Sequence, residues 1–358
     1  MRRYRKWFFT GLAILAVELG FVALLNYIVD PQGVFRYGVW RHDVSHQFFI
    51  QPSKNFIKTR YVALNPQKYD CLIFGSSRVN GIDGRQIKNA TCYTMSYPDA
   101  LPRNHLDNLR YILKRGARPR IVLIGLDEFA YKEDPAEHFT DYMRYPYPPA
   151  VHQNRVLFYL KYLIRYSPRS MNDQFEGFVG KRQPIPYDHY GTGLDEAPAE
   201  GDRAIEADPV NYVKDTRFEQ PMLTQGDRIR EALEEIRETV DLLKAHGIRL
   251  IVFINPIHKV TYLATGLEKF LLFEKELSKI TSFYDFSGLN SITTNNYYYY
   301  ETSHYRRNVG AMMLARMFNE SSVKVPADFG VLVTKENIDQ HLADLKTQVA
   351  GLGSAVRW

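Results

Sequence analysis

Hydrophobic residues between positions 66 and 320 follow two alternating patterns. Short apolar runs bounded by glycine and polar residues are typical of strands, whereas apolar residues spaced three and four apart are typical of helices. The predicted strands are residues 69–75, 90–97, 120–129, 248–258 and 281–288, and the predicted helices are 101–116, 227–247, 267–280 and 309–318. Near-continuous apolar strands indicate a parallel sheet covered on both faces. The pattern predicts an α/β fold with a three-layer, doubly wound, mostly parallel sheet.

Three segments depart from this alternation. Residues 131–225 are rich in Pro, Tyr, Gly and charge, with one helical piece in RVLFYLKYLIRY. This stretch is too long for a connecting loop and predicts a folded insertion in the domain of residues 66–320. Residues 30–65 are expected to form an irregular juxtamembrane segment. Residues 321–358 are expected to be a tail that packs on the domain.

Residues 7–29 are apolar apart from Thr10, Glu18 and Asn26, which is long enough for a membrane-spanning helix. Residues 1–6 carry four cations, so the positive-inside rule predicts a cytoplasmic amino terminus and an extracytoplasmic body. The alternative is a cleaved signal peptide, but the apolar region is long and no A-x-A site follows it. Glu18 is either a protonated carboxyl tolerated in a single span or a contact with another membrane protein.

Composition narrows the possible functions. Of the formal net charge of +6, four positive charges lie in the first six residues, so the body is nearly balanced. This argues against a nucleic-acid-binding surface. Cys71 and Cys92 begin two neighbouring predicted strands, so they are either a disulfide or two buried thiols, and their spacing gives no metal site.

Polar side chains follow every predicted strand. In a doubly wound sheet the carboxyl ends of the strands meet at one edge, where the site lies. The residues expected there are Ser76, Ser77, Arg78, Ser96, Asp99, Asp127, Glu128, Asn255, His258, Asp285 and Ser287. Arg78 is expected either to bind an anion or to pair within the fold. The aromatic run of residues 297–300 is expected either to stack on sugar rings or to be partly core.

His304 differs from the other histidines because it precedes the last core helix and has Glu301 three residues upstream. A carboxylate at that spacing can hold the imidazole by its Nδ1 proton, which leaves Nε2 free to take a proton from a serine hydroxyl. The alternative is a helix N-terminus capped by Thr302 or Ser303, with Glu301 beside the helix dipole. Both interpretations can hold together.

The two end blocks of the domain resemble those of the SGNH (GDSL-type) hydrolase family. Gly75-Ser76-Ser77 is similar to the family's G-D-S block, and the segment from Glu301 to His304 is similar to its D-x-x-H block, with Glu in place of Asp. The resemblance implies that Ser77 is a nucleophile, His304 its base and Glu301 the orienting acid, with no metal or organic cofactor.

The middle blocks depart from the family pattern. The family usually offers a glycine and an asparagine to the oxyanion, where this chain has Ser96 and Asp127. An ionised Asp127 cannot donate a hydrogen bond. Expected substitutes are backbone N–H groups near Ser77 and Ser96, or the side chain of Asn255.

A single amino-terminal anchor together with G-S-S-R resembles membrane-anchored bacterial SGNH-like proteins of cell-envelope O-acylation and O-acetylation. This resemblance implies an inner-membrane serine esterase or O-acyltransferase that acts on acyl groups of a cell-envelope glycan outside the membrane. It also implies a membrane-bound O-acyltransferase as partner. The alternative function is a catalytically weak glycan-binding or scaffold subunit of such a complex. A flavodoxin-like ligand-binding domain is less favoured because no phosphate-binding loop is present.

Overall fold

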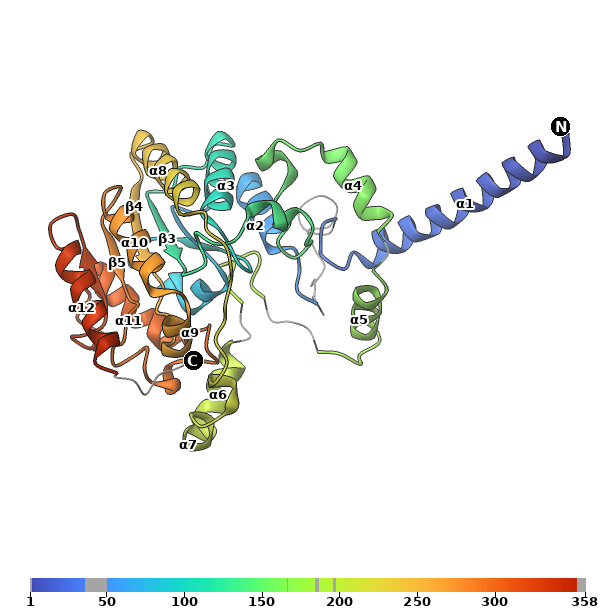
Figure 1. Cartoon of the computed structure of the whole chain (residues 1–358). Coiled ribbons are helices and arrows are strands. Elements are labelled where there is room, and N and C mark those ends of the chain that lie inside the picture. The colour runs from blue at the N-terminus through green and yellow to red at the C-terminus, as the bar shows by residue number, and fades with distance from the viewer. Residues whose placement is uncertain (1, 36–49, 166, 184–186, 196–197, 353–358) are drawn as a thin grey trace.

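The computed structural model describes residues 2–35, 50–165, 167–183, 187–195 and 198–352. Residue 1 of the predicted tip, parts of the predicted juxtamembrane segment and insertion, and residues 353–358 of the tail lie outside this description. A helix projects from an α/β body in which helices surround a twisted sheet (Figure 1).

The sheet has six strands in the order β2-β1-β3-β4-β5-β6. The first five in that order are parallel, and β6 runs antiparallel to β5. The strands are β1 (Cys71–Gly75), β2 (Cys92–Ser96), β3 (Ile121–Leu126), β4 (Arg249–Ile254), β5 (Phe283–Asp285) and β6 (Val331–Val333). The five predicted strands are confirmed, with tighter ends. The tail adds β6, which is too short for its pattern to stand out in the sequence.

The helices connect and cover these strands. The α-helices are α1 (Arg2–Val29), α2 (Lys54–Leu64), α3 (Pro102–Lys114), α4 (Arg155–Leu163), α5 (Pro168–Phe178), α6 (Pro198–Ala207), α7 (Pro209–Tyr212), α8 (Ile229–Ala245), α9 (Lys259–Ala264), α10 (Leu267–Ser278), α11 (Arg307–Phe318) and α12 (Ile338–Ala350). The short 3-10 helices are η2 (Ser77–Gly81), η3 (Gly84–Gln86), η4 (Pro135–Phe139), η5 (Pro148–Val151), η6 (Thr216–Phe218) and η7 (Asn296–Tyr298). The four predicted core helices are confirmed as α3, α8, α10 and α11.

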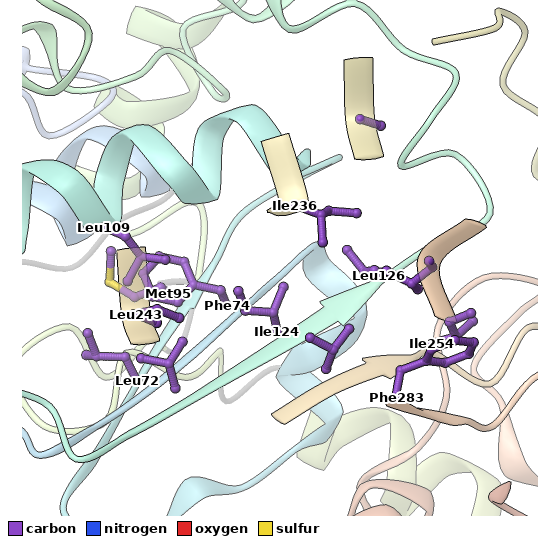
Figure 2. Close-up of a cluster of buried hydrophobic side chains, with 14 of the residues drawn as sticks. Leu72, Phe74, Met95, Leu109, Ile124, Leu126, Ile236, Leu243, Ile254 and Phe283 are labelled. Atoms are coloured by element: carbon purple, nitrogen blue, oxygen red, sulfur yellow. The ribbon is translucent and has the colours of Figure 1, made fainter. Parts of the chain in front are cut away.

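Alternate strand residues pack on opposite faces of the sheet, because successive side chains of a strand point to opposite sides. Leu72, Phe74 and Ile124 pack with residues of α3, α8 and α10 in one buried cluster, part of which Figure 2 shows. Ile73 and Leu123 belong to a second cluster with residues of η2 and α11. The sheet is therefore covered on both faces, as the apolar strands predicted.

The segment of residues 30–65 is not irregular throughout. It contains α2, in which ten of eleven residues are buried. Mixed polar and apolar residues in KNFIKTRYVAL hide this burial from a hydrophobicity pattern, because Lys54 and Lys58 find buried polar partners. Part of a segment expected to be irregular and outside the domain is therefore a helix within its packed body.

Among the described residues, one helix is long and apolar enough to cross a membrane, and it lies at the amino terminus. Its apolar span is Tyr4–Val29, and none of the most apolar window is buried against the body. A signal sequence passes the same test of length and apolar composition. The cytoplasmic amino terminus and the extracytoplasmic body therefore stay predictions. The disulfide is present: Cys71 and Cys92 face each other on β1 and β2 and their sulfurs are bonded.

Candidate functional site

Ser77 is the first residue of η2, two residues after the end of β1, at the carboxyl edge of the sheet. The turn is tight: a Cβ on Gly75 would meet Val79 Cγ1 at 2.4 Å and the Gly125 carbonyl oxygen at 3.2 Å. Glycine is therefore required by the close approach of β3 and η2. The Ser76 hydroxyl accepts a hydrogen bond from the Arg78 backbone N–H (3.2 Å), which caps η2 and fixes where Ser77 points.

Ser77, His304 and Glu301 form one hydrogen-bonded chain. Ser77 Oγ lies 2.7 Å from His304 Nε2. The Glu301 carboxylate contacts His304 Nδ1 on the other side of the ring. Because the carboxylate holds the proton on Nδ1, Nε2 is left as the acceptor for the Ser77 hydroxyl. The two blocks, 227 residues apart in sequence, therefore meet in a hydroxyl–imidazole–carboxylate arrangement, the geometry that a serine nucleophile with a base and an orienting acid requires.

The Glu301 side chain is held by its own loop. Its two oxygens accept the backbone N–H groups of Ser303 and His304, both at 2.8 Å. Burial raises the pKa of Glu301, but the hydrogen bonds and charge of His304, with these backbone donors, outweigh it and lower the pKa below its usual value. Glu301 is thus an anion fixed in place.

The predicted helix cap at this loop is wrong. Helix α11 begins at Arg307, and its N-cap residue Arg306 makes no side-chain capping bond. The Thr302 hydroxyl donates to the Gln220 carbonyl (2.5 Å), and Ser303 Oγ accepts from Arg78 Nε (3.2 Å). The loop is therefore organised around Glu301 and Arg78 and not around the helix terminus.

Ser77, Glu301 and His304 lie on the wall of a cavity of about 650 Å³. Its wall comes from η2, α2, the residues after β2, the insertion and the His304 loop. The polar and aromatic lining residues are Gln51, Lys54, Ser77, Arg78, Asn80, Tyr97, Asp99, Asp195, Tyr300, Glu301, His304 and Tyr305. Lys54 and Asp195 form an ion pair in this wall. Of the aromatic run 297–300, Tyr300 reaches the cavity, whereas Tyr299 is fully buried.

Arg78 lies at the cavity wall, but its guanidinium points into the protein and donates to buried carboxylates. It is 2% exposed and pairs with Asp127 (2.8 Å) and, through both terminal nitrogens, with Glu128. Burial lowers the pKa of Arg78, but the two carboxylates outweigh it and raise the pKa above its usual value. Through the bond from its Nε to Ser303, Arg78 also connects the Ser77 turn to the His304 loop. Of the two predicted roles, these contacts fit ion pairing within the fold and not the binding of an anion.

Several other predicted site residues lie outside the cavity wall. Ser76, Ser96, Asp127, Asn255 and His258 are each under 2% exposed and do not line it. The Asn255 amide donates to the Leu126 carbonyl and to Asp127, and its oxygen accepts from Tyr305, so it has no donor left for a substrate. His258 contacts Asn296 through Nε2 and caps α9 through Nδ1. Packing around the triad accounts for these side chains.

Asn80 is the residue that the sequence did not single out. It is 8% exposed and lines the cavity with Ser77. Its Oδ1 accepts a hydrogen bond from Ser96 Oγ at 2.7 Å. Its Nδ2 has no hydrogen-bond partner among the described residues, so a donor is left facing the cavity. The spacing from Ser77 to Asn80, one turn of a 3-10 helix, was the available signal.

Ser96 is in turn held by Lys58. Lys58 Nζ donates to the Ser96 carbonyl oxygen (2.7 Å) and contacts Ser96 Oγ (3.0 Å). Burial lowers the pKa of Lys58 well below its usual value; the charge of Lys54 lowers it further, while Asp195 opposes this. The buried relay Lys58–Ser96–Asn80 fixes the orientation of the Asn80 amide.

One group among the described residues could hold a metal ion: Glu274, Asp285 and His341. All three are buried, on α10, β5 and α12. Asp285 and His341 hydrogen-bond each other at 2.7 Å, while Glu274 has no hydrogen-bond partner among the described residues. None of the three lines the Ser77 cavity, so the chemistry of that site does not depend on them.

Comparisons with family models and with curated proteins found no match to this chain.

Proposed function

We propose that the protein is a membrane-anchored serine esterase or O-acyltransferase that forms an acyl-enzyme on Ser77. The observation that supports this best is the hydrogen-bonded chain Ser77–His304–Glu301 on the wall of a sizeable cavity. A nucleophile within hydrogen-bond reach of a base, and the base oriented by a third group, is the geometric signature of covalent acyl transfer.

In the first half-reaction, Ser77 Oγ attacks the acyl carbonyl carbon as His304 Nε2 takes the hydroxyl proton. The negative charge that develops on the carbonyl oxygen needs donors fixed in advance. Asn80 Nδ2 is one. The Ser77 backbone N–H, which has no partner among the described residues, is a second. Collapse of the tetrahedral intermediate breaks the bond to the leaving alcohol, which receives the proton from His304.

In the second half-reaction, a hydroxyl attacks the Ser77 ester and His304 again acts as base and then acid. Water gives hydrolysis, and an alcohol gives transfer. Glu301 stays ionised and stabilises the imidazolium in both halves, which fits its lowered pKa. No redox step or extra reactant is required.

The acceptor in this proposal is a hydroxyl of a cell-envelope glycan. A polar wall with the Lys54–Asp195 pair and Asp99, and the partly exposed face of Tyr300, suits a ligand rich in hydroxyls. The apolar helix α1 would keep the domain beside the membrane. A membrane-bound O-acyltransferase that supplies the acyl group is the partner that the resemblance implies.

The test treats purified, detergent-solubilised protein with p-nitrophenyl acetate and, separately, with a fluorophosphonate, and follows turnover and intact mass. We expect one phosphonyl adduct and measurable turnover, both lost in Ser77→Ala. The matched control is Ser321→Ala, an exposed serine in a turn after α11, which should behave as wild type. A folded wild-type protein that neither turns over nor labels would contradict the enzyme and favour a scaffold role.

A further inference from the structure

Helix α4 in the insertion is apolar on both sides. Its Phe158 and Tyr162 are buried and pack with Phe56 of α2. The opposite side carries four exposed apolar residues: Val156 (67% exposed), Leu157 (52%), Leu160 (54%) and, just past the helix end, Ile164 (51%). A surface helix of a water-soluble protein normally has charged or polar residues on its solvent-facing side. The apolar residues on the outer side of α4 therefore indicate that this side contacts something apolar.

Helix α5 repeats the feature. Phe175 (59% exposed) and Val179 (50%), just after the helix, are four residues apart and so share one side of it. Two neighbouring elements of the insertion therefore present apolar side chains outward. Large exposed apolar side chains gathered on neighbouring helices indicate an interaction site.

Both helices lie at the end of α1 nearest the body, one on each side of it (Figure 1). The attachment is specific: Asn26 Nδ2 donates to the Leu163 and Arg165 carbonyl oxygens, both at 2.7 Å. The Tyr162 hydroxyl donates to buried Asp30 at 3.0 Å. The exit of α1 and the carboxyl end of α4 are thus fixed to each other.

The dimensions of α1 place this junction at a membrane surface. A 26-residue span is about 39 Å long at 1.5 Å per residue, whereas a bilayer's hydrocarbon core is about 30 Å thick. When the helix is centred, Asn26 lies about 14 Å from the bilayer midplane, at the boundary between the hydrocarbon core and the lipid headgroups. Whatever is bonded to Asn26 is at that depth too.

The charge around the exposed apolar residues fits lipid headgroups. Residues 155–182 contain six Lys or Arg and two Asp or Glu. Arg155, Lys161 and Arg169 are exposed beside the apolar residues. Apolar residues on one side of a helix with cations flanking them is the pattern of helices that lie in the membrane interface and attract anionic lipid.

We propose that α4 and α5 form a second membrane contact, lying in the interface with Val156, Leu157, Leu160, Ile164, Phe175 and Val179 directed into the acyl region. The partner is the anionic lipid surface around the exit of α1. The contact holds the insertion, and with it one wall of the Ser77 cavity, at a fixed height over the membrane. This inference rests on α1 being a membrane span and is independent of the Ser77 chemistry.

The test uses the full chain in phosphatidylglycerol-containing vesicles, with a nitroxide attached to a single introduced cysteine. Leu157→Cys and Phe175→Cys report on the proposed contact, Leu15→Cys on the middle of α1, and Leu272→Cys on an exposed leucine (49%) of α10. Cys71 and Cys92 are joined and do not take the label. Oxygen concentrates in the bilayer and nickel-EDDA stays in water, so their relative effects on the label report its depth.

We expect the labels at Leu157 and Phe175 to be severalfold more accessible to oxygen relative to nickel than the label at Leu272, though less so than the label at Leu15. If both resemble Leu272 while Leu15 is lipid-exposed, α1 is an anchor and the proposed contact is refuted. Labels shielded from both reagents would show a protein partner on this surface, which also refutes it. A water-exposed label at Leu15 would overturn the anchor itself, leaving the Ser77 chemistry to its own assay.

Discussion

Replacement of Asn80 by alanine tests the least expected part of the site. The change removes the Nδ2 donor that faces the cavity and leaves Ser77, His304 and Glu301 in place. Loss of one preorganised oxyanion donor lowers kcat by about 10²–10³, equivalent to roughly 2.7–4 kcal/mol of transition-state stabilisation. Because the donor acts on charge that appears only in the transition state, KM should change little.

A second substitution, Ser96→Ala, tests whether the relay matters. It removes the hydroxyl that holds Asn80 Oδ1 at 2.7 Å but leaves the amide donor present. A single neutral hydrogen bond is worth about 1 kcal/mol, so we expect a loss of kcat of about fivefold. If Ser96 acts only through Asn80, the double variant should be no worse than Asn80→Ala.

Steady-state hydrolysis of p-nitrophenyl acetate measures both effects, with circular dichroism to establish folding. Asn211→Ala, an exposed asparagine at the end of α7, is the matched control and should retain wild-type kcat. An Asn80→Ala protein within threefold of wild type would refute the assignment of Asn80 to the oxyanion. So would a Ser96→Ala protein that is more impaired than Asn80→Ala.

Two further substitutions concern carboxylates. Glu301→Gln removes the anion that stabilises the His304 imidazolium, so kcat should fall by about 10²–10⁴ with folding unchanged; activity near wild type in the ester assay would contradict the triad. Burial, and secondly the charge of Asp285, raises the pKa of Glu274 well above 4.5, so the folded protein keeps a proton that the unfolded chain releases as pH rises. Because the folded state binds this proton more tightly, the free energy of unfolding falls with rising pH, by up to about 1.4 kcal/mol per pH unit. Glu274→Gln should therefore raise the thermal midpoint at pH 8 and change it little at pH 4; a lower midpoint at pH 8 would contradict the shift.

Local pattern located most of the strands and core helices of the scaffold and the two ends of the site, although it missed α2 and β6. Apolar runs and helical spacing located five strands and four core helices because each burial pattern is set by neighbours in sequence. Ser77 could be predicted because it follows a buried strand, and the carboxyl ends of parallel strands lie at one edge of the sheet, where sites form. His304 and Glu301 could be predicted because the acid and its imidazole are only three residues apart.

The tertiary structure decided what depends on the direction of a side chain and on partners far away in sequence. Asn80 faces the cavity because η2 turns it there and Ser96, 16 residues away in sequence, holds its amide. Ser96 is in turn held by Lys58, 38 residues away. Arg78 is directed inward because Asp127 and Glu128 lie beneath it. The second apolar side of α4 becomes visible only when Phe158 is seen to be buried and Leu157 is not. Composition states which groups a chain has; long-range packing determines which of them remain available.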